Sequence, residues 1–367
     1  MIPVSDPVFG QEEEDNLVDC IRTKWVSSEG KYVKSLEALC AEYSGVTDGI
    51  SVSSGTSALQ VAVQSLDLPA NSEVIVPSFT IISCVLAIIE AGLVPVLVDS
   101  DPVTWCMDTA SIEGKITDRT SAIMVVHMYG HPVDMDVVDG LAKKYSLKTI
   151  EDAAEAHGAE YKGRKCGGLA DVSILSFYAN KLITTGEGGM VLTNDPAVAE
   201  RARMLRNLCF VPNPRFLHSQ IGHNYRMSNL QAAVGVAQIK RLDQFVDRKQ
   251  KMAALYHEGL KDLPIQLPIE LDWAKNNYWM YSVVLDDEVP LDVETCRARL
   301  REKGVDTRTF FIGMHEQPIF KEMGYFEGEQ YPVCERITRR GFYLPSGQAI
   351  TDEQIQTVID AMVEVLG

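Results

Sequence analysis

The chain has 367 residues, of which 46% are hydrophobic, with a net charge of −17 and an isoelectric point near 4.9. This length can bury a large core and predicts two domains. The acidic balance argues against nucleic acid as a partner, because a surface that binds a phosphate backbone is basic. The eight cysteines are scattered, without metal-ligand spacing, which predicts reduced thiols in a cytoplasmic protein and no metal site.

No signal peptide or membrane span is expected. Acidic residues at 12–15 interrupt the N-terminal segment, and the apolar stretch 74–98 is broken by Pro77, Glu90 and Pro95. The pattern predicts a buried strand, a buried helix at 83–91 and a second buried strand.

Short apolar runs alternate with amphipathic segments from about Gly49 to Asn194. The predicted strands are residues 50–52, 74–76, 94–98, 122–127, 148–151, 174–177 and 190–193. Because these runs are apolar along their whole length, they predict a mainly parallel sheet that is covered on both faces. Sites in such sheets gather where strands end, and residues 53–56, 77–80, 127–130 and Asp152 occupy such ends.

The pattern changes in the C-terminal third. A long helix is predicted from Leu230 to about Leu260, then a strand at 279–285, a helix at 293–303 and an extended piece at 307–312. The last helix opens at Thr351 with a capping-box pattern. We therefore predict a large domain of residues 1–250 and a small α/β domain of residues 251–367, with the N-terminal segment as a candidate to pack on the small domain.

Lys181 and Asp152 are the candidate catalytic residues. Lys181 lies between an apolar strand and a glycine-rich turn, and Asp152 ends another apolar run. A lysine amine forms Schiff bases and a buried aspartate can keep a pyridine nitrogen protonated, which are the two groups that pyridoxal phosphate (PLP) chemistry needs. A solvated lysine and a helix-capping aspartate are the commoner structural interpretations.

A small-residue turn at 53–59 leads from a strand into a helix. Gly55 allows close backbone approach, and the N–H groups at the helix start suit a phosphate, although such turns more often only cap a helix. Neither G-x-x-x-x-G-K-[ST] nor G-x-G-x-x-G is present, so nucleotide hydrolysis and dinucleotide binding lose support. His127, His131 and His157 lie near the same edge, and each is interpreted as a satisfied structural histidine.

Two further turns follow Lys181. Residues 186–189 are interpreted as a tight turn into an antiparallel edge strand, where glycine gives turn geometry and room for a substrate. Ser228 or Asn229 is predicted to cap the next helix. The alternative is a phosphate contact from that helix start, with Arg226 as an anion partner or a structural clamp.

In this order, the segments resemble the DegT/DnrJ/EryC1/StrS family of nucleotide-sugar aminotransferases. The resemblance spans nearly the whole chain and is carried by residues 54–59, 151–158, 176–177, 181, 186–189 and 224–229. It implies the α/β fold of type I (aspartate aminotransferase-like) PLP-dependent transferases, with a large, mainly parallel sheet domain and a small C-terminal α/β domain.

The resemblance also implies roles for individual residues. Lys181 would form the Schiff base with PLP, Asp152 would pair with the pyridine nitrogen, and Glu155 would contact the side of the ring hydroxyl. The residues that would hold the phosphate are Gly55, Thr56 and Ser176, together with Asn229 of the partner subunit. That last role implies a homodimer with shared active sites, or a tetramer built from such dimers.

Other segments would lie near the substrate or the cofactor ring. The resemblance places residues 25–31, 310–315 and 344–347 near the sugar nucleotide. Relatives often hold an aromatic ring over PLP where this chain has Ile81, and Phe79 is the aromatic residue nearby.

The implied reaction moves an amino group from glutamate to C4 of a 4-keto-6-deoxy sugar nucleotide. Residues 127–132, 160–165, 278–281 and 343–347 resemble members that convert GDP-4-keto-6-deoxymannose to GDP-perosamine, a product for O-antigen or surface polysaccharide synthesis. A UDP- or dTDP-linked 4-keto or 3-keto sugar is the open alternative. Lys181 argues against a PLP sugar dehydratase, which carries histidine there, and a non-catalytic PLP-binding protein would tolerate the loss of Lys181 or Asp152.

Overall fold

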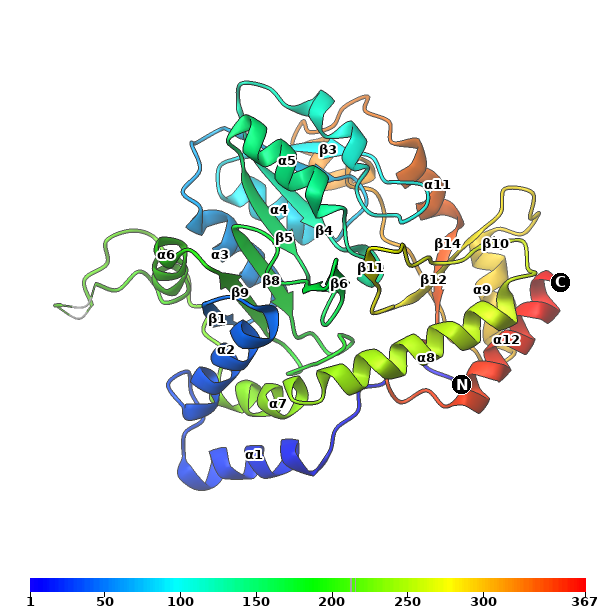
Figure 1. The fold of residues 1–367 in the computed structure, drawn as a ribbon, viewed down its shortest axis with the longest axis horizontal. Helices are drawn as coiled ribbons and strands as arrows, with labels where there is room; N and C mark the ends of the chain where they lie inside the picture. The colour runs from blue at the N-terminus through cyan, green and yellow to red at the C-terminus, as the bar shows by residue number, and fades with distance from the viewer. Residues whose placement is uncertain (212, 215) are drawn as a thin grey trace.

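A computed structural model describes residues 1–211, 213–214 and 216–367 (Figure 1). Its centre is a seven-stranded sheet in the order β1-β9-β8-β5-β4-β2-β3. The pairs from β3 to β8 are parallel, and β9 is antiparallel to both of its neighbours. The strands are β1 (Asp48–Val52), β2 (Glu73–Pro77), β3 (Val94–Val98), β4 (Thr120–Val126), β5 (Lys148–Asp152), β8 (Val172–Ser176) and β9 (Gly189–Thr193). The predicted mainly parallel sheet is confirmed.

The prediction that residues 190–193 form an edge strand is wrong. β9 lies between β1 and β8 and is buried along its whole length, and β1 takes the edge. The predicted tight turn before it is present, because Gly186 has a φ of +81°. The pairing of β9 with β1 joins segments far apart in the chain, which no local sequence pattern reports.

Helices cover the sheet, and β2, β8 and β9 are therefore buried at every residue. α3 packs against α4 and α6, α5 contacts β4 and β5, and α1 and α2 both pack on α7. The helix predicted at 83–91 is α4, whereas α1 and α2 were not predicted. The bounds are α1 (Gln11–Thr23), α2 (Lys31–Ser44), α3 (Gly55–Ser65), α4 (Ile82–Glu90), α5 (Met135–Tyr145), α6 (Pro196–Arg206) and α7 (Asn229–Ile239).

The single helix predicted from Leu230 to Leu260 is two helices. α7 ends at Ile239 and α8 (Leu242–Leu260) follows, with Arg241 between them at φ −105° and ψ 4°. The Arg241 guanidinium donates to the Val8 carbonyl at 3.0 Å and lies 4.7 Å from the Phe245 ring centroid. The N-terminal segment thus holds the bend, while the apolar spacing continues across it and hides it from sequence analysis.

The C-terminal residues form a four-stranded antiparallel sheet in the order β10-β12-β14-β13. α8 runs beneath it and packs on α12 (Figure 1). A three-stranded sheet, β11-β6-β7, joins this part to the large sheet's loops. The bounds are β6 (Glu160–Tyr161), β7 (Arg164–Lys165), β10 (Ile265–Gln266), β11 (Ala274–Lys275), β12 (Tyr281–Leu285), α9 (Val293–Glu302), β13 (Arg308–Thr309), α10 (Pro318–Glu322), α11 (Pro332–Arg340), β14 (Gly341–Leu344) and α12 (Asp352–Leu366).

Two hydrophobic clusters fill the molecule, one around the large sheet and one formed by residues from Met252 to Val365. The first cluster also takes in Phe310 and Ile337, so the C-terminal residues contribute to both. Ile2 donates to the Gly304 carbonyl at 2.7 Å, which packs the start of the chain on this C-terminal part. The division at residue 250 stays a prediction. In the part of the chain that the structure describes, no helix is both long and apolar enough to cross a membrane.

The capping box of α12 is present as predicted and gives a stability test. Thr351 Oγ1 accepts the Gln354 N–H at 3.2 Å, and Gln354 Oε1 accepts the Thr351 N–H at 3.0 Å. Thr351→Ala should lower the free energy of unfolding by about 1 kcal/mol in urea denaturation, because it leaves the Gln354 N–H without its acceptor. Thr357→Ala, on the exposed side of α12, is the control, and an equal loss in both variants would contradict the capping role.

Candidate active site

A cavity of about 380 Å³ opens where β5 and β8 end. Asp152 is the last residue of β5 and Ser176 the last of β8. The parallel register pairs Asp152 with Ile174, so Asp152 and Ser176 lie at the same edge of the sheet. Six of the seven predicted cofactor residues line this cavity: Gly55, Thr56, Asp152, Glu155, Ser176 and Lys181.

The Lys181 amine lies between a carboxylate and an aromatic ring, and its side chain is only 11% exposed. Its Nζ lies 3.7 Å from Glu155 Oε1 and 3.6 Å from the Trp279 ring centroid. Burial lowers the pKa of Lys181, and the charges of Glu155 and Asp152 oppose that shift. A buried amine with a lowered pKa is more often neutral, and only the neutral amine can attack a carbonyl.

Asp152 is fixed by hydrogen bonds to both carboxylate oxygens. Oδ1 accepts the Ala154 N–H at 2.9 Å, and Oδ2 accepts the Cys84 thiol at 3.2 Å. Burial raises the pKa of Asp152, while these two bonds and the charge of Lys181 lower it. The capping interpretation is wrong, because the residues that follow Asp152 form turns rather than a helix.

Glu155 is held in place by the loop at 127–130, which sequence analysis placed at a strand end without giving Tyr129 a role. Its Oε2 accepts the Tyr129 N–H at 2.8 Å, and Tyr129 has a left-handed backbone with a φ of 52°. The Asn277 side chain holds the Glu155 carbonyl at 2.9 Å. Burial raises the pKa of Glu155 to about 7, although Lys181 and the Tyr129 N–H lower it.

The start of α3 has the form of an anion cradle. Ser54 Oγ accepts the Ser57 N–H at 3.1 Å, which leaves the N–H groups of Gly55 and Thr56 without an acceptor inside the helix. A Cβ on Gly55 would lie 2.8 Å from Ser176 Cβ and Oγ, so only glycine lets the turn approach Ser176 this closely. Ser54 caps the helix, and the same turn presents free donors to the cavity.

Asn229 does not line this cavity in its own chain. Its Oδ1 accepts the Tyr32 N–H at 2.9 Å, and its Nδ2 donates to the Trp25 carbonyl at 2.7 Å. Ser228 caps α7 in a capping box with Gln231. A cofactor contact of Asn229 therefore requires a partner subunit and stays a prediction.

Ile81, and not Phe79, borders the cavity. Ile81 is 38% exposed and lines it, whereas Phe79 is fully buried and packs on the rings of Tyr129, Phe310 and Phe311. The aromatic residues that line the cavity are Tyr178, Trp279 and Phe311. The segments that carry them matched the family pattern, but the sequence did not indicate which of their residues face the cavity.

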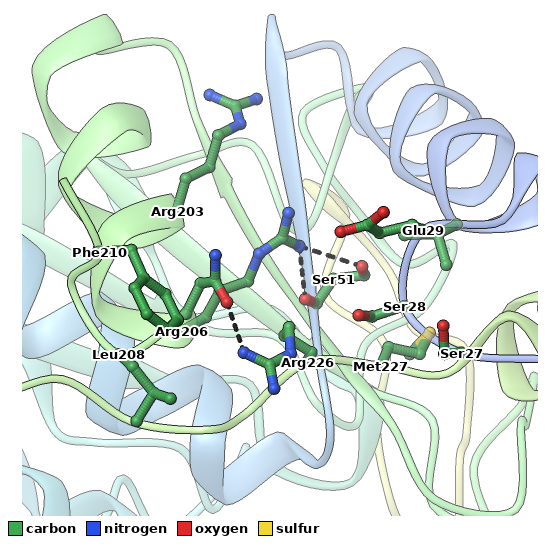
Figure 2. Close-up of a pocket in the computed structure, with 12 residues that line it drawn as sticks. Ser27, Ser28, Glu29, Ser51, Arg203, Arg206, Leu208, Phe210, Arg226 and Met227 are labelled. Atoms are coloured by element: carbon green, nitrogen blue, oxygen red, sulfur yellow. Dashed lines mark hydrogen bonds between the residues drawn. The ribbon is translucent and has the colours of Figure 1, made fainter. Parts of the chain in front are cut away.

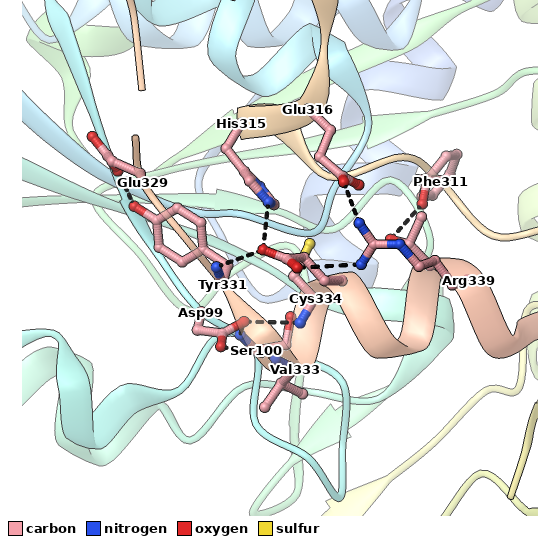
Figure 3. A network of polar contacts seen from close by, with 12 residues as sticks. Asp99, Ser100, Phe311, His315, Glu316, Glu329, Tyr331, Val333, Cys334 and Arg339 are labelled. Atoms are coloured by element: carbon pink, nitrogen blue, oxygen red, sulfur yellow. Dashed lines mark hydrogen bonds and ion pairs between the residues drawn. The ribbon is translucent and has the colours of Figure 1, made fainter. Parts of the chain in front are cut away.

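The predicted substrate segment at 310–315 lies only partly at the cavity. Phe311 lines it, and Thr338 of α11 donates to the Phe311 carbonyl at 3.1 Å. His315, labelled in Figure 3, instead contacts Glu335, with a distance of 3.3 Å between Nε2 and Oε1. His315 is thus part of the network that supports this segment, and residues 344–347 do not line the cavity either.

A second cavity of about 800 Å³ is lined in part by the predicted substrate segment at 25–31 (Figure 2). Ser27, Ser28 and Glu29 line it, across from Arg226, whose guanidinium donates to Asn207. The segment 25–31 therefore lies apart from Lys181 of its own chain, and Arg226 acts there as a structural clamp.

Two of the three histidines are satisfied, as predicted. His127 Nδ1 accepts the Val133 N–H at 3.0 Å, so Nε2 carries the proton and donates to Glu151 at 2.9 Å. His127, Glu151 and Cys166 lie close enough to suit a metal ion, but Glu151 already accepts several protein hydrogen bonds. The prediction for His157 is wrong, since neither of its ring nitrogens has a partner among the described residues.

These groups fit a cofactor that carries an aldehyde, a ring nitrogen and a phosphate. Lys181 can bond to the aldehyde, Asp152 can hold the protonated nitrogen and the start of α3 can hold the phosphate. Fold and site together define a PLP-dependent transferase of the aspartate aminotransferase type. The profile of the DegT/DnrJ/EryC1/StrS aminotransferase family matches residues 7–363, and the chain belongs to this family.

Known proteins similar to this chain match it over nearly its full length. The GDP-perosamine synthase of Escherichia coli O157:H7 is 38% identical over 99% of this chain and 98% of its own, and that of Caulobacter vibrioides is 37% identical over 100% and 98%. The crystal structure of Streptomyces venezuelae DesV in complex with a ketimine intermediate superposes with a TM-score of 0.89, at 34% identity, over 96% of this chain and 94% of DesV.

Glu155 should make the stability of the cofactor-free protein depend on pH. Because its pKa is raised to about 7, its stabilising contribution is complete at low pH and is lost as the pH rises through 7. Glu155→Gln should therefore gain stability relative to wild type between about pH 5 and pH 8, by up to about 3 kcal/mol in urea denaturation. Glu187→Gln is the control, because Glu187 lines the same cavity but is exposed. A difference between Glu155→Gln and wild type that is the same at both pH values would contradict the assignment.

Proposed function

We propose that this protein is a PLP-dependent aminotransferase that moves the amino group of glutamate to C4 of a 4-keto-6-deoxy sugar nucleotide. The observation that carries the proposal is the placement of Lys181 Nζ, 3.7 Å from Glu155 and in one cavity with Asp152. The presence of both Lys181 and Asp152 disfavours the dehydratase and the non-catalytic alternatives.

Each residue of the cavity has a chemical task. PLP supplies an electron sink when it is bound. Lys181 binds it covalently and, as a free amine, can accept a proton and return it. Asp152 keeps the ring nitrogen protonated. The Trp279 ring lies over the Lys181 amine and keeps water from it, which strengthens the charge interactions around the amine.

The substrate proposal is GDP-4-keto-6-deoxymannose, with GDP-perosamine as the product. Its support is the full-length similarity to two proteins named GDP-perosamine synthase. A cytoplasmic location and a role in O-antigen or surface polysaccharide synthesis accompany this substrate. UDP- and dTDP-linked keto sugars are the competing substrates.

A homodimer with shared active sites forms part of the proposal. Residues 25–31 and Asn229 lie away from Lys181 of their own chain, so a partner subunit must bring them to a cavity if they contact cofactor or substrate. Large apolar side chains at Trp25, Leu217 and Ile221 are exposed, and burial in an interface between subunits would remove them from water. A tetramer would repeat this contact.

The decisive test offers the purified protein glutamate and a panel of GDP-, UDP- and dTDP-linked 4-keto and 3-keto sugars. We expect an amino sugar from GDP-4-keto-6-deoxymannose, identified by mass and NMR, and an absorbance band from cofactor bound to Lys181. Lys181→Ala should lose the band and at least about 100-fold in turnover, since it removes the proton-transfer group. Turnover of only UDP or dTDP substrates would overturn the GDP assignment, and no amino transfer to any sugar would overturn the function.

Replacing Ile81 tests how the cofactor ring is covered. Ile81→Phe should lower the PLP dissociation constant by about 2- to 10-fold, because an aromatic contact adds about 0.5–1.5 kcal/mol beyond area burial. Equilibrium dialysis with absorbance detection measures it, and Ile81→Leu is the aliphatic control. Equal dissociation constants for the Phe and Leu variants would show that residue 81 does not face the ring.

A further inference from the structure

Asp152 lies at the end of a buried hydrogen-bond chain. Its Oδ2 accepts the Cys84 thiol at 3.2 Å, and the Cys84 sulfur is in turn 3.2 Å from Thr80 Oγ1. Thr80 and Cys84 are completely buried and Asp152 is 1% exposed. Neither Cys84 nor its contact with Asp152 was indicated by the sequence patterns.

The proton count fixes the direction of this chain. A thiol has a single proton, and Cys84 uses it to donate a hydrogen bond to Asp152. The Thr80 hydroxyl must therefore be the donor in the hydrogen bond to the Cys84 sulfur. A hydrogen bond accepted by the sulfur polarises the S–H group and strengthens the bond that it donates. The chain therefore runs from Thr80 through Cys84 to Asp152.

This direction requires Asp152 as an acceptor at both oxygens. Oδ1 already accepts the Ala154 N–H, so a proton on either oxygen would compete with an existing donor. The network thus fits the ionised carboxylate. Cys84 also lies in the first turn of α4, where the partial positive charge of the helix start favours a nearby anion.

The surroundings of Asp152 explain why such support matters. Burial raises the pKa of this carboxyl, whereas its ring-binding task needs the ionised form. The ionisable groups that face it come from four segments: Cys84 of α4, His127 after β4, Glu155 after β5 and Lys181 after β8. The Cys84 thiol is a neutral donor at hydrogen-bond distance, so its support of Asp152 does not depend on the charge of Lys181.

We propose that Cys84 is a positioning residue whose thiol orients the Asp152 carboxylate and keeps it ionised for the ring nitrogen of the cofactor. The proposal rests on the proposed function, because it assigns Cys84 to the same cavity. No covalent step is involved, and the thiol keeps its proton throughout.

The test measures the PLP dissociation constant of the full-length protein without substrate, from about pH 5 to pH 9, by equilibrium dialysis and absorbance. Cys84→Ala should weaken PLP binding about 3- to 10-fold near neutral pH, the range expected for one lost hydrogen bond. As the pH is lowered, the Cys84→Ala variant should also lose PLP binding at a higher pH than wild type does, because Asp152 without its donor takes up a proton more easily. Cys84→Ser should restore both properties, since a hydroxyl also donates.

Three comparisons separate this role from general damage. Cys40→Ala removes another fully buried thiol, in α2 and outside the cavity, and should bind PLP with the wild-type pH dependence. Asp152→Ala should bind PLP weakly without the acid-side transition, because the titrating carboxyl is gone. Thr80→Val keeps the side-chain shape, removes the donor to sulfur and should shift the transition in the same direction as Cys84→Ala by a smaller amount.

Each outcome decides the proposal. The Cys84 proposal would be overturned if Cys84→Ala shows the wild-type pH dependence, or if Cys84→Ser behaves like Cys84→Ala. In either case, PLP binding by the wild-type protein would leave the proposed function intact. Absence of PLP binding in wild type would overturn both. If the Cys84 variants fail to fold by circular dichroism, Thr80→Val decides, and its wild-type behaviour would then reject the chain of donors.

Discussion

The burial of one amine together with two carboxylates is the interaction on which the rest of the site depends. Asp152 and Glu155 are buried and the Lys181 side chain is only 11% exposed, and an isolated charge in such a position costs several kcal/mol. Lys181 lowers the pKa of both carboxyl groups, whereas the charge of Asp152 raises the pKa of Glu155, so the two carboxylates also depend on the hydrogen bonds that their oxygen atoms accept. Tyr129, Ala154 and Cys84 supply those donors.

The residues around Glu155 and Lys181 are held in place by hydrogen bonds from segments that are far away in the sequence. Asn277 donates to the carbonyls of Glu155 and His157, both at 2.9 Å, and Trp279 Nε1 donates to the Asn180 carbonyl at 2.8 Å beside Lys181. Lys249 of α8, itself buried, donates to the Trp279 carbonyl at 2.9 Å. The C-terminal part thus closes the cavity that the large sheet opens, and the bend between α7 and α8 brings it there.

Sequence patterns located the strands well because each strand contains a short apolar run, and the ends of these runs mark the strand ends. They placed Lys181, Asp152 and the turn at Gly55 at one edge for the same reason. They failed where a contact joins distant segments: the pairing of β9 with β1, the bend at Arg241 and the unpartnered ring of His157. Phe79 looked as suitable as Ile81 to cover the cofactor until packing showed which of them faces the cavity.

The sequence by itself determined the class of fold and the family, and it singled out Lys181 and Asp152 as the candidate catalytic residues, because these depend on local runs of residue types and their spacing. Only the tertiary structure decided what surrounds them. The Trp279 ring over Lys181, the Tyr129 N–H at Glu155, the Cys84 thiol at Asp152 and the separate location of Asn229 depend on side-chain direction and long-range packing. The periodicity of the sequence determines which face of a helix or strand is apolar, but it does not determine which residues from distant segments contact that face.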